Sequence, residues 1–243
     1  MTQESFTIQK QTLAAEDTYR LELAGNTSAL HTPGQFVNVA LPGRFLRRPF
    51  CVATWDEGEM ALLYKVVGEG TRELSRLPAG TQLDVLVGLG NGFDTRDSGT
   101  APLLCGGGLG AAPMYALCRA LRAEGKEAAV LLGFNTAAEI VLEEEFRALG
   151  ASLTIFTLDG SAGRRGFVTD LMPDLNYSYV YSCGPMAMMR AVSAAAATGA
   201  QFSLEARMAC GFGACVGCTI QTANGPRRVC ADGPVFRKEE ILW

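Results

Sequence analysis

The most restrictive feature of this sequence is a group of four cysteines near its C-terminus. Four, two and eleven residues separate them, in the pattern Cys210-x4-Cys215-x2-Cys218-x11-Cys230. Thiolates that bind one metal centre must converge on it, so this spacing predicts a tightly wrapped loop at the end of the chain. The other four cysteines are scattered and show no second ligand pattern.

The C-x4-C-x2-C spacing with a more distant fourth cysteine is typical of plant-type [2Fe–2S] sites, in which four thiolates satisfy two tetrahedral irons. An anionic cluster also needs backbone N–H groups directed at its sulfurs. Small residues leave those groups unobstructed here, namely Gly211, Gly213, Ala214 and Gly217. The alternative is a structural zinc site, but such sites usually place their cysteines as two C-x2-C pairs, and only Cys215 and Cys218 are so spaced.

The composition and charge of the chain exclude several classes of protein. The chain has 243 residues, a net charge of −4 and 48% hydrophobic residues, which is enough for a packed core. We expect no nucleic-acid or membrane binding, because no basic stripe, leader or spanning segment is visible. The only histidine, His31, excludes a two-histidine zinc protease or Rieske site and is expected in a solvated loop. Eight cysteines without a leader are expected in a reducing, cytoplasmic setting.

Period-2 alternation of apolar residues dominates the first part of the chain, residues 1–99. Segments such as Tyr19–Leu23 and Leu83–Val87 alternate in this way and are separated by Gly, Pro and Asn. Such segments predict antiparallel strands, and several of them can close into a small β-barrel. Further strands are predicted at Val37–Leu41 and Leu62–Val66, and one short helix at Thr71–Leu77.

Residues 100–200 change to an alternation of buried strands and helices, which predicts an α/β domain with a parallel sheet covered on both faces. Residues 201–243 carry the cysteines, show little regular pattern and are predicted to form a third, small domain. In the α/β region the predicted strands are Leu103–Cys105, Ala128–Phe134, Leu153–Leu158 and Tyr177–Ser182, and the predicted helices are Met114–Glu124, Leu142–Leu149 and Met186–Ala197.

A glycine-rich turn follows the first strand of the α/β region. It reads Gly106-Gly107-Gly108-Leu109-Gly110 and matches G-x-G-x-x-A at Gly106, Gly108 and Ala111. Backbone N–H groups in such a turn, together with the start of a helix, can receive a pyrophosphate. The turn can equally serve only to bring a helix close to the sheet.

A second strand–turn–helix transition occurs at Ser182-Cys183-Gly184-Pro185-Met186. Ligands bind at the carboxyl ends of strands in open α/β sheets, so this turn and the glycine turn are expected to flank one nicotinamide. Cys183 lies either near the reacting ring or in the core as a structural residue.

The whole chain resembles the ferredoxin-reductase superfamily, and it is most similar to the electron-transfer subunits of type B dihydroorotate dehydrogenase. The resemblance covers essentially all of the chain. It is most specific in Leu204-Glu205-Ala206-Arg207-Met208-Ala209-Cys210-Gly211 and in Cys230-Ala231-Asp232-Gly233-Pro234-Val235-Phe236. It implies FAD in the barrel, NAD in the α/β domain and a [2Fe–2S] cluster in the third domain.

The resemblance also implies which residues contact FAD. The superfamily's Arg-x-aromatic-Ser motif reads Arg48-Pro49-Phe50-Cys51 here, with Arg48 expected on a flavin phosphate and Cys51 where a serine is usual. Because a thiol is a weak donor, the hydrogen bond of that serine to the flavin is in doubt. The other matching flavin residues are Leu63, Tyr64 and Lys65 in one segment, and Gly70 and Thr71 in another.

In this family a separate FMN-containing catalytic subunit oxidises dihydroorotate, and two subunits of each kind form a heterotetramer. The resemblance therefore implies that this chain is an oxidoreductase component passing electrons to NAD. Two alternatives remain: a similar subunit serving a hydrogenase, a sulfide dehydrogenase or an NADH-dependent ferredoxin reductase, and a zinc-stabilised redox-sensing module without enzymatic activity.

Arg164 and Arg165 are expected to be solvated charges, although they could contact a 2′-phosphate. The apolar tail Ile241–Trp243 either docks on a neighbour or packs back on its own domain.

Overall fold

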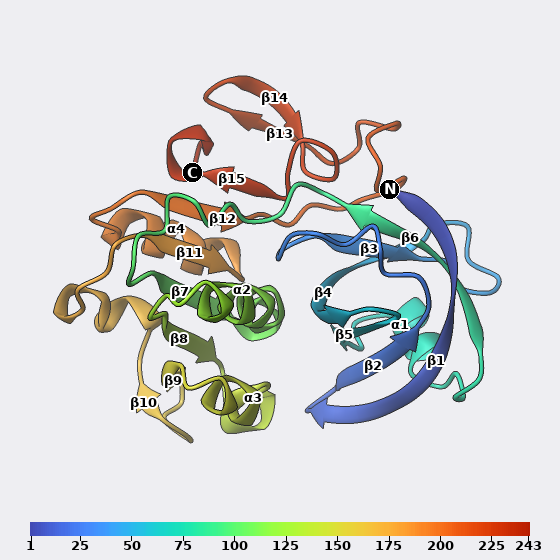
Figure 1. Ribbon diagram of the computed structural model, residues 1–243, viewed down its shortest axis with the longest axis horizontal. Helices are drawn as coiled ribbons and strands as arrows, with labels where there is room; N and C mark the ends of the chain where they lie inside the picture. The colour runs from blue at the N-terminus through green and yellow to red at the C-terminus, as the bar shows by residue number, and fades with distance from the viewer.

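The computed structural model describes residues 1–243, and its first part is a closed antiparallel barrel. The six strands close in the order β1-β2-β5-β4-β3-β6 (Figure 1). Side chains at alternating positions, such as Leu21, Leu23 and Val85, fill the barrel and are almost fully buried. The strands are β1 (Thr2–Ala15), β2 (Thr18–Ala24), β3 (Phe36–Val39), β4 (Arg48–Asp56), β5 (Glu59–Lys65) and β6 (Gln82–Leu89).

A single short helix, α1 (Glu69–Leu74), accompanies the barrel and begins two residues before the predicted Thr71. Its start is stabilised by Thr71, whose Oγ1 accepts hydrogen bonds from the N–H groups of Val67 (3.0 Å) and Gly68 (3.2 Å). These bonds satisfy donors that a helix N-terminus otherwise leaves unpaired.

The second part is a seven-stranded sheet in the order β10-β9-β8-β7-β11-β12-β15. Five of its six pairings are parallel, as the alternation of strands and helices predicts. Helix α2 lies between the sheet and the barrel (Figure 1) and packs on β4 as well as on β7. The elements are β7 (Leu103–Gly107), α2 (Ala111–Ala123), β8 (Ala129–Phe134), α3 (Glu143–Ala148), β9 (Ser152–Thr157), β10 (Arg164–Arg165), β11 (Val180–Cys183) and α4 (Met186–Ala195).

The sheet extends beyond the predicted α/β region. Strand β12 (Ala200–Ser203) pairs in parallel with β11, and β15 (Val235–Arg237) pairs antiparallel with β12. The boundary predicted at residue 200 therefore falls inside a strand, and the segment holding the cysteines leaves the sheet and returns to it. Strand β11 begins at Val180, three residues later than predicted.

The cysteine segment contains one small hairpin, β13 (Thr219–Thr222) and β14 (Gly225–Arg228), which stands above the junction of the other two parts in Figure 1. The apolar tail packs back on its own chain: the Trp243 ring lies edge-on to Phe202, with 5.0 Å between centroids. No helix is both long enough and apolar enough to cross a bilayer.

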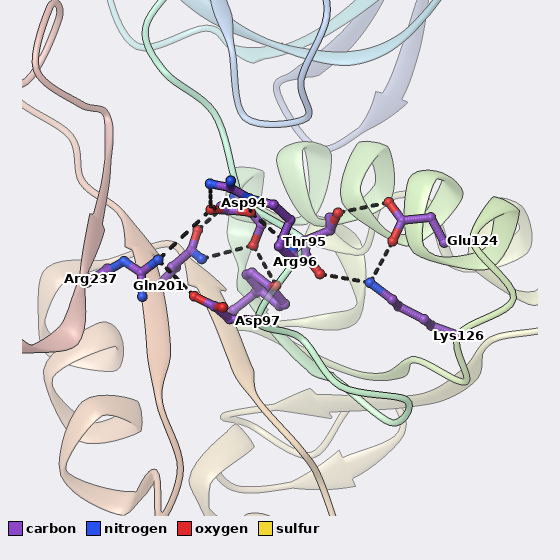
Figure 2. Close-up of polar contacts among 9 residues, drawn as sticks. Asp94, Thr95, Arg96, Asp97, Glu124, Lys126, Gln201 and Arg237 are labelled. Atoms are coloured by element: carbon purple, nitrogen blue, oxygen red, sulfur yellow. Dashed lines mark hydrogen bonds and ion pairs between the residues drawn. The ribbon is translucent and has the colours of Figure 1, made fainter.

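Residues 94–97 lie in the connection between β6 and β7, which joins the barrel to the sheet, and they are held from several sides (Figure 2). The buried Gln201 amide of β12 binds the Asp94 backbone twice, donating to its carbonyl (2.9 Å) and accepting from its N–H (2.9 Å). Tyr181 also donates to that carbonyl (2.8 Å), and Arg237 of β15 pairs with Asp97 (2.8 Å). The barrel is therefore fixed relative to the sheet by side chains of β11, β12 and β15.

Candidate functional site

The two predicted turns lie side by side, because β7 and β11 are neighbouring parallel strands. A Cβ at Gly110 would collide with the carbonyl of Cys183, and one at Gly184 (φ 149°) would lie 2.9 Å from the Cα of Gly107. Only glycine permits this close approach of two backbones. The structure thus brings together both segments that sequence analysis assigned to the nicotinamide.

A cavity of about 460 Å³ opens at the carboxyl ends of β7, β8, β9 and β11. Of the predicted residues, Gly107, Gly108 and Pro185 line it, whereas Gly106, Gly110, Cys183 and Gly184 do not. This is the position at which open α/β sheets bind nucleotides. The wall also includes residues that sequence analysis did not single out, among them Gly133, Asn135, Glu139, Leu158 and Phe167.

On the barrel, Arg48 lies against the start of α1. Its Nε would be 2.9 Å from a Cβ placed on Gly70, so a larger residue there would displace the guanidinium. Arg48 donates to the carbonyl of Leu46 (2.7 Å) and forms no ion pair with a carboxylate. An unneutralised guanidinium beside a glycine suits a bidentate contact with a phosphate, so these residues fit FAD.

The remaining predicted flavin residues differ in what they can present to a ligand. Phe50 of β4 packs on Tyr64 of β5, with ring centroids 5.6 Å apart, and Pro49 is half-buried. Tyr64 is 1% exposed, belongs to the barrel core and donates to Gln11, so its side chain is not free to contact a cofactor. Leu63 packs in the core shared with the sheet. Lys65 reaches out of the barrel and pairs with Glu139 (2.9 Å).

Three titratable side chains from separate segments influence one another near the end of β11, where Cys183 lies. Burial, and after it the neighbouring Glu205, raise the pKa of Cys51 to about 12. Burial, followed by Cys51 and Glu205, likewise raises the pKa of Cys183. Loss of surrounding water raises the pKa of Glu205, although the residue as a whole is exposed. The thiol that replaces the usual serine therefore stays protonated at neutral pH, and it lies near Cys183 and Glu205.

The four C-terminal cysteines form two pairs. The sulfurs of Cys218 and Cys230 are 3.2 Å apart and buried, whereas the Cys215 N–H donates to the sulfur of Cys210 at 3.4 Å. Burial, together with Cys218, raises the pKa of Cys230 to about 12. A cation bound by both sulfurs would displace their protons and stabilise the two neighbouring thiolates. Two sulfurs for each of two irons is the ligand distribution of a [2Fe–2S] cluster.

The loop around Cys210 is arranged for an anion. Burial opposes ionisation, but the N–H groups of Cys215, Phe212 and Ala214 lower the pKa of Cys210 to about 6. Positive φ angles at Gly211 (77°) and Gly213 (92°) turn the backbone so that these groups converge. The donor set therefore fits a thiolate-ligated cluster.

Two residues that sequence analysis missed hold this loop. Asn38 of β3 is fully buried and donates to the carbonyl of Cys210 (3.0 Å), which fastens the cluster loop to the barrel. Arg228 donates to the carbonyl of Gly213 (2.8 Å) and pairs with Asp232 (3.3 Å). An asparagine inside a strand is an unusual core residue, and that was the available signal for Asn38.

Two family models match the chain. The iron-sulfur cluster binding domain of dihydroorotate dehydrogenase B matches residues 205–242, and the oxidoreductase NAD-binding domain matches residues 104–194. These ranges contain the four C-terminal cysteines and the two glycine turns, respectively.

Similar proteins align over the full length. The dihydroorotate dehydrogenase B (NAD(+)) electron transfer subunit of Fusobacterium nucleatum is 37% identical, with 98% of each chain covered. Its counterpart in Listeria monocytogenes serotype 4a is 41% identical, with 99% of each chain covered.

Solved structures share the fold. An NADH-dependent reduced ferredoxin-NADP oxidoreductase, described in connection with flavin-based electron bifurcation, has a TM-score of 0.88 and 32% identity over 98% of this chain and 90% of that one. Phthalate dioxygenase reductase has a TM-score of 0.64 and 20% identity over 79% and 63%, which indicates the fold alone. The predicted ferredoxin-reductase-like architecture is confirmed.

Proposed function

Because the chain belongs to the family of dihydroorotate dehydrogenase B electron transfer subunits, we propose that it passes electrons from a dihydroorotate-oxidising partner to NAD. It is an oxidoreductase component that uses FAD, a [2Fe–2S] cluster and NAD. The predicted family and cofactors are therefore confirmed, and nothing favours a hydrogenase-type subunit or a zinc-stabilised sensor.

One observation supports this function more than any other: the cysteine loop is bonded directly to the flavin barrel. Asn38, which donates to Cys210, lies on β3, and β3 pairs with the Arg48–Cys51 segment of β4. The dinucleotide cavity lies at the carboxyl edge of the sheet, and Lys65, one of the predicted flavin residues, pairs with Glu139 in its wall. The predicted flavin residues thus have links both to the strand that binds the cysteine loop and to the cavity, which supports a path from cluster to flavin to NAD.

The chain's own residues have separable tasks. Cys210, Cys215, Cys218 and Cys230 hold the irons, Arg48 binds a flavin phosphate, and Gly107 and Gly108 present N–H groups to the dinucleotide. When bound, the flavin supplies the exchange between one-electron chemistry at the cluster and two-electron hydride transfer with NAD. Because Cys51 stays protonated at neutral pH, it presents an uncharged thiol in place of the usual serine hydroxyl.

We propose that the partner is an FMN-containing catalytic subunit, in a cytoplasmic heterotetramer with two subunits of each kind. It docks on the cluster loop, where Cys215 is exposed between Phe212 (46% exposed) and Val216 (61% exposed). Apolar side chains around an exposed ligand allow a partner to exclude water and approach the cluster closely.

The experiment is anaerobic co-expression of the chain with the catalytic subunit, followed by iron, sulfide and flavin analysis and an assay of NADH formation from dihydroorotate. We expect two irons, two sulfides and one FAD per chain, with NADH formed. Cys215→Ser should abolish NADH formation, whereas Cys118→Ala, at a thiol buried in the core of the α/β region, should retain it. A fully loaded complex that forms no NADH would refute the proposal.

A further inference from the structure

The dinucleotide cavity contains one charged side chain in its wall, Glu139. This residue ends a short 3₁₀ turn, Ala137–Glu139, in the connection that follows β8. Its side chain is 19% exposed. A carboxylate in an otherwise apolar and glycine-rich wall needs polar partners, and these partners show what the residue does.

The two oxygens of Glu139 bind different parts of the molecule. Oε1 accepts from Nζ of Lys65 at 2.9 Å, and Lys65 is the last residue of barrel strand β5. Oε2 accepts from the backbone N–H of Asn135 (3.1 Å) and from its Nδ2 (2.8 Å), and Asn135 also lines the cavity. One side chain thus connects the flavin barrel to the wall of the dinucleotide cavity.

Neighbouring hydrogen bonds hold the same turn from both directions. On the barrel side, the N–H of Glu16 donates to the carbonyl of Ala138 (2.9 Å). On the cavity side, the N–H of Ala137 donates to Oγ of Ser161 (2.7 Å) in the loop that follows β9. The turn therefore cannot follow a movement of the barrel without moving the cavity wall.

The pair is charged at neutral pH. Burial opposes ionisation of Glu139, but hydrogen bonds from Lys65 and Asn135 outweigh it, and the pKa of Glu139 lies below its usual value. The hydrogen bond to Glu139 raises the pKa of Lys65. A half-buried pair of this kind is screened less by salt than a surface pair.

We propose that Lys65 and Glu139 are positioning residues for hydride transfer: their ion pair holds the dinucleotide cavity at the distance and orientation from the flavin barrel that the reaction requires. This inference rests on the proposed function. Hydride transfer needs reacting atoms about 3–3.5 Å apart, and a misplacement of about 1 Å can cost about 100-fold in rate. Neither residue needs to touch the reacting atoms to have this effect.

The chain offers a matched control. Arg119 of α2 pairs with Asp56 of β4 at 3.1 Å, so this ion pair also joins the sheet region to the barrel. The side chains of Arg119 and Lys65 are both 35% exposed, but neither Arg119 nor Asp56 lines the cavity. Loss of the Arg119 pair should loosen the contact without moving the cavity wall.

The test compares Lys65→Met, Glu139→Gln, Lys65→Arg and Arg119→Met in the full chain loaded with FAD and iron. Stopped-flow absorbance gives the rate of flavin reduction at saturating NADH and the long-wavelength charge-transfer band, and calorimetry gives the affinity for ADP-ribose. We expect Lys65→Met and Glu139→Gln to reduce the rate at least tenfold and to weaken the band, with ADP-ribose affinity changed less than about threefold. Lys65→Arg should keep most of the rate, and Arg119→Met should stay within about twofold of the parent.

The outcomes separate the two proposals. If the parent flavin is not reduced by NADH and ADP-ribose does not bind, the proposed function fails, and the inference fails with it. If the parent is active but Glu139→Gln matches its rate and its charge-transfer band, the positioning role alone is overturned. Equal slowing in Arg119→Met would also overturn it, because the effect would then be general loosening. If Lys65→Met loses its flavin, the rate and the charge-transfer band of Glu139→Gln alone test the positioning role, because that variant removes the ion pair and leaves Lys65 in place.

Discussion

At the scale of single residues, Val216 is the residue whose backbone fits its side chain least well. Its φ is 53°, in the left-handed region that β-branched residues rarely adopt, and it lies between the predicted cluster ligands Cys215 and Cys218. Left-handed backbone costs such a residue about 1–2 kcal/mol. Glycine would remove that cost, so a valine here indicates that its exposed side chain is used, which agrees with the proposed docking of the partner on this loop.

We therefore predict that Val216→Gly keeps its iron and raises the free energy of unfolding by about 0.5–1 kcal/mol, the relieved strain less the extra entropy of unfolded glycine. It should also weaken binding of the catalytic subunit, because an apolar contact is lost. Urea unfolding and calorimetric titration measure the two effects. Leu13→Ala, at an equally exposed apolar residue of β1 (65%), should not change partner binding. An unchanged affinity in Val216→Gly would exclude this docking surface.

At the scale of elements, residues 94–97 of the β6–β7 connection are bonded to side chains of β11, β12 and β15 and help to fix the barrel on the sheet (Figure 2). Hydrogen bonds from the side chain and the backbone of Arg96 lower the pKa of Asp94 to about 2, against partial burial. A carboxyl whose folded pKa is depressed stabilises the fold above its unfolded pKa, and this contribution is lost as the pH falls through the folded pKa.

Asp94 should therefore contribute stability that is complete above about pH 5 and disappears between about pH 4 and pH 2, amounting to at most about 2 kcal/mol. Asp94→Asn should be less stable than the parent at pH 7, and the difference should vanish near pH 2. Denaturant unfolding over this pH range checks the prediction. Asp174→Asn, at a carboxyl without a hydrogen-bond partner in the structure, serves as the control and should follow the parent curve. A constant difference between Asp94→Asn and the parent at every pH would show that the carboxyl charge is not the cause.

At the scale of the whole molecule, side-chain amides join parts that are distant in sequence. Asn38 joins the barrel to the cluster loop. Asn91, just after β6, binds the backbone of Val235 twice, donating to its carbonyl (2.8 Å) and accepting from its N–H (3.1 Å). Each side-chain amide bonds to backbone groups as a neighbouring strand would. Because these hydrogen bonds are directional, they fix the relative orientation of the two joined parts, which an apolar contact does not do.

Asn38→Ala should retain its cluster, because the cysteines and their N–H donors are untouched, and should destabilise the chain by about 1–3 kcal/mol by leaving the Cys210 carbonyl unpaired. The loosened loop should slow reduction of the cluster by NADH. Iron analysis and freeze-quench electron paramagnetic resonance measure the two quantities. Asn224→Ala, in the exposed β13–β14 turn, should change neither. Loss of iron in Asn38→Ala would assign the residue to cluster assembly instead.

Local patterns account for what sequence analysis predicted. The cysteine spacing, the glycine turns and the apolar alternation of β2 and β6 are all set within short segments, so a single sequence exposes them. The polar strand β1, by contrast, gave no clear alternation, although it pairs with both β2 and β6. The site residues that sequence analysis missed, Asn38, Glu139 and Arg228, carry no motif of their own.

The sequence by itself determined the spacing of the four thiolates and the two glycine turns from which cofactor sites are predicted, because ligand spacing and backbone freedom are properties of neighbouring residues. Only the tertiary structure decided that β12 and β15 join the same sheet and that Lys65 reaches Glu139 rather than solvent. It also decided that Cys51 and Glu205 lie near enough to Cys183 to raise its pKa. These contacts join residues far apart in the chain, and their stability comes from burial and hydrogen bonding that exist only after the barrel and the sheet have packed together.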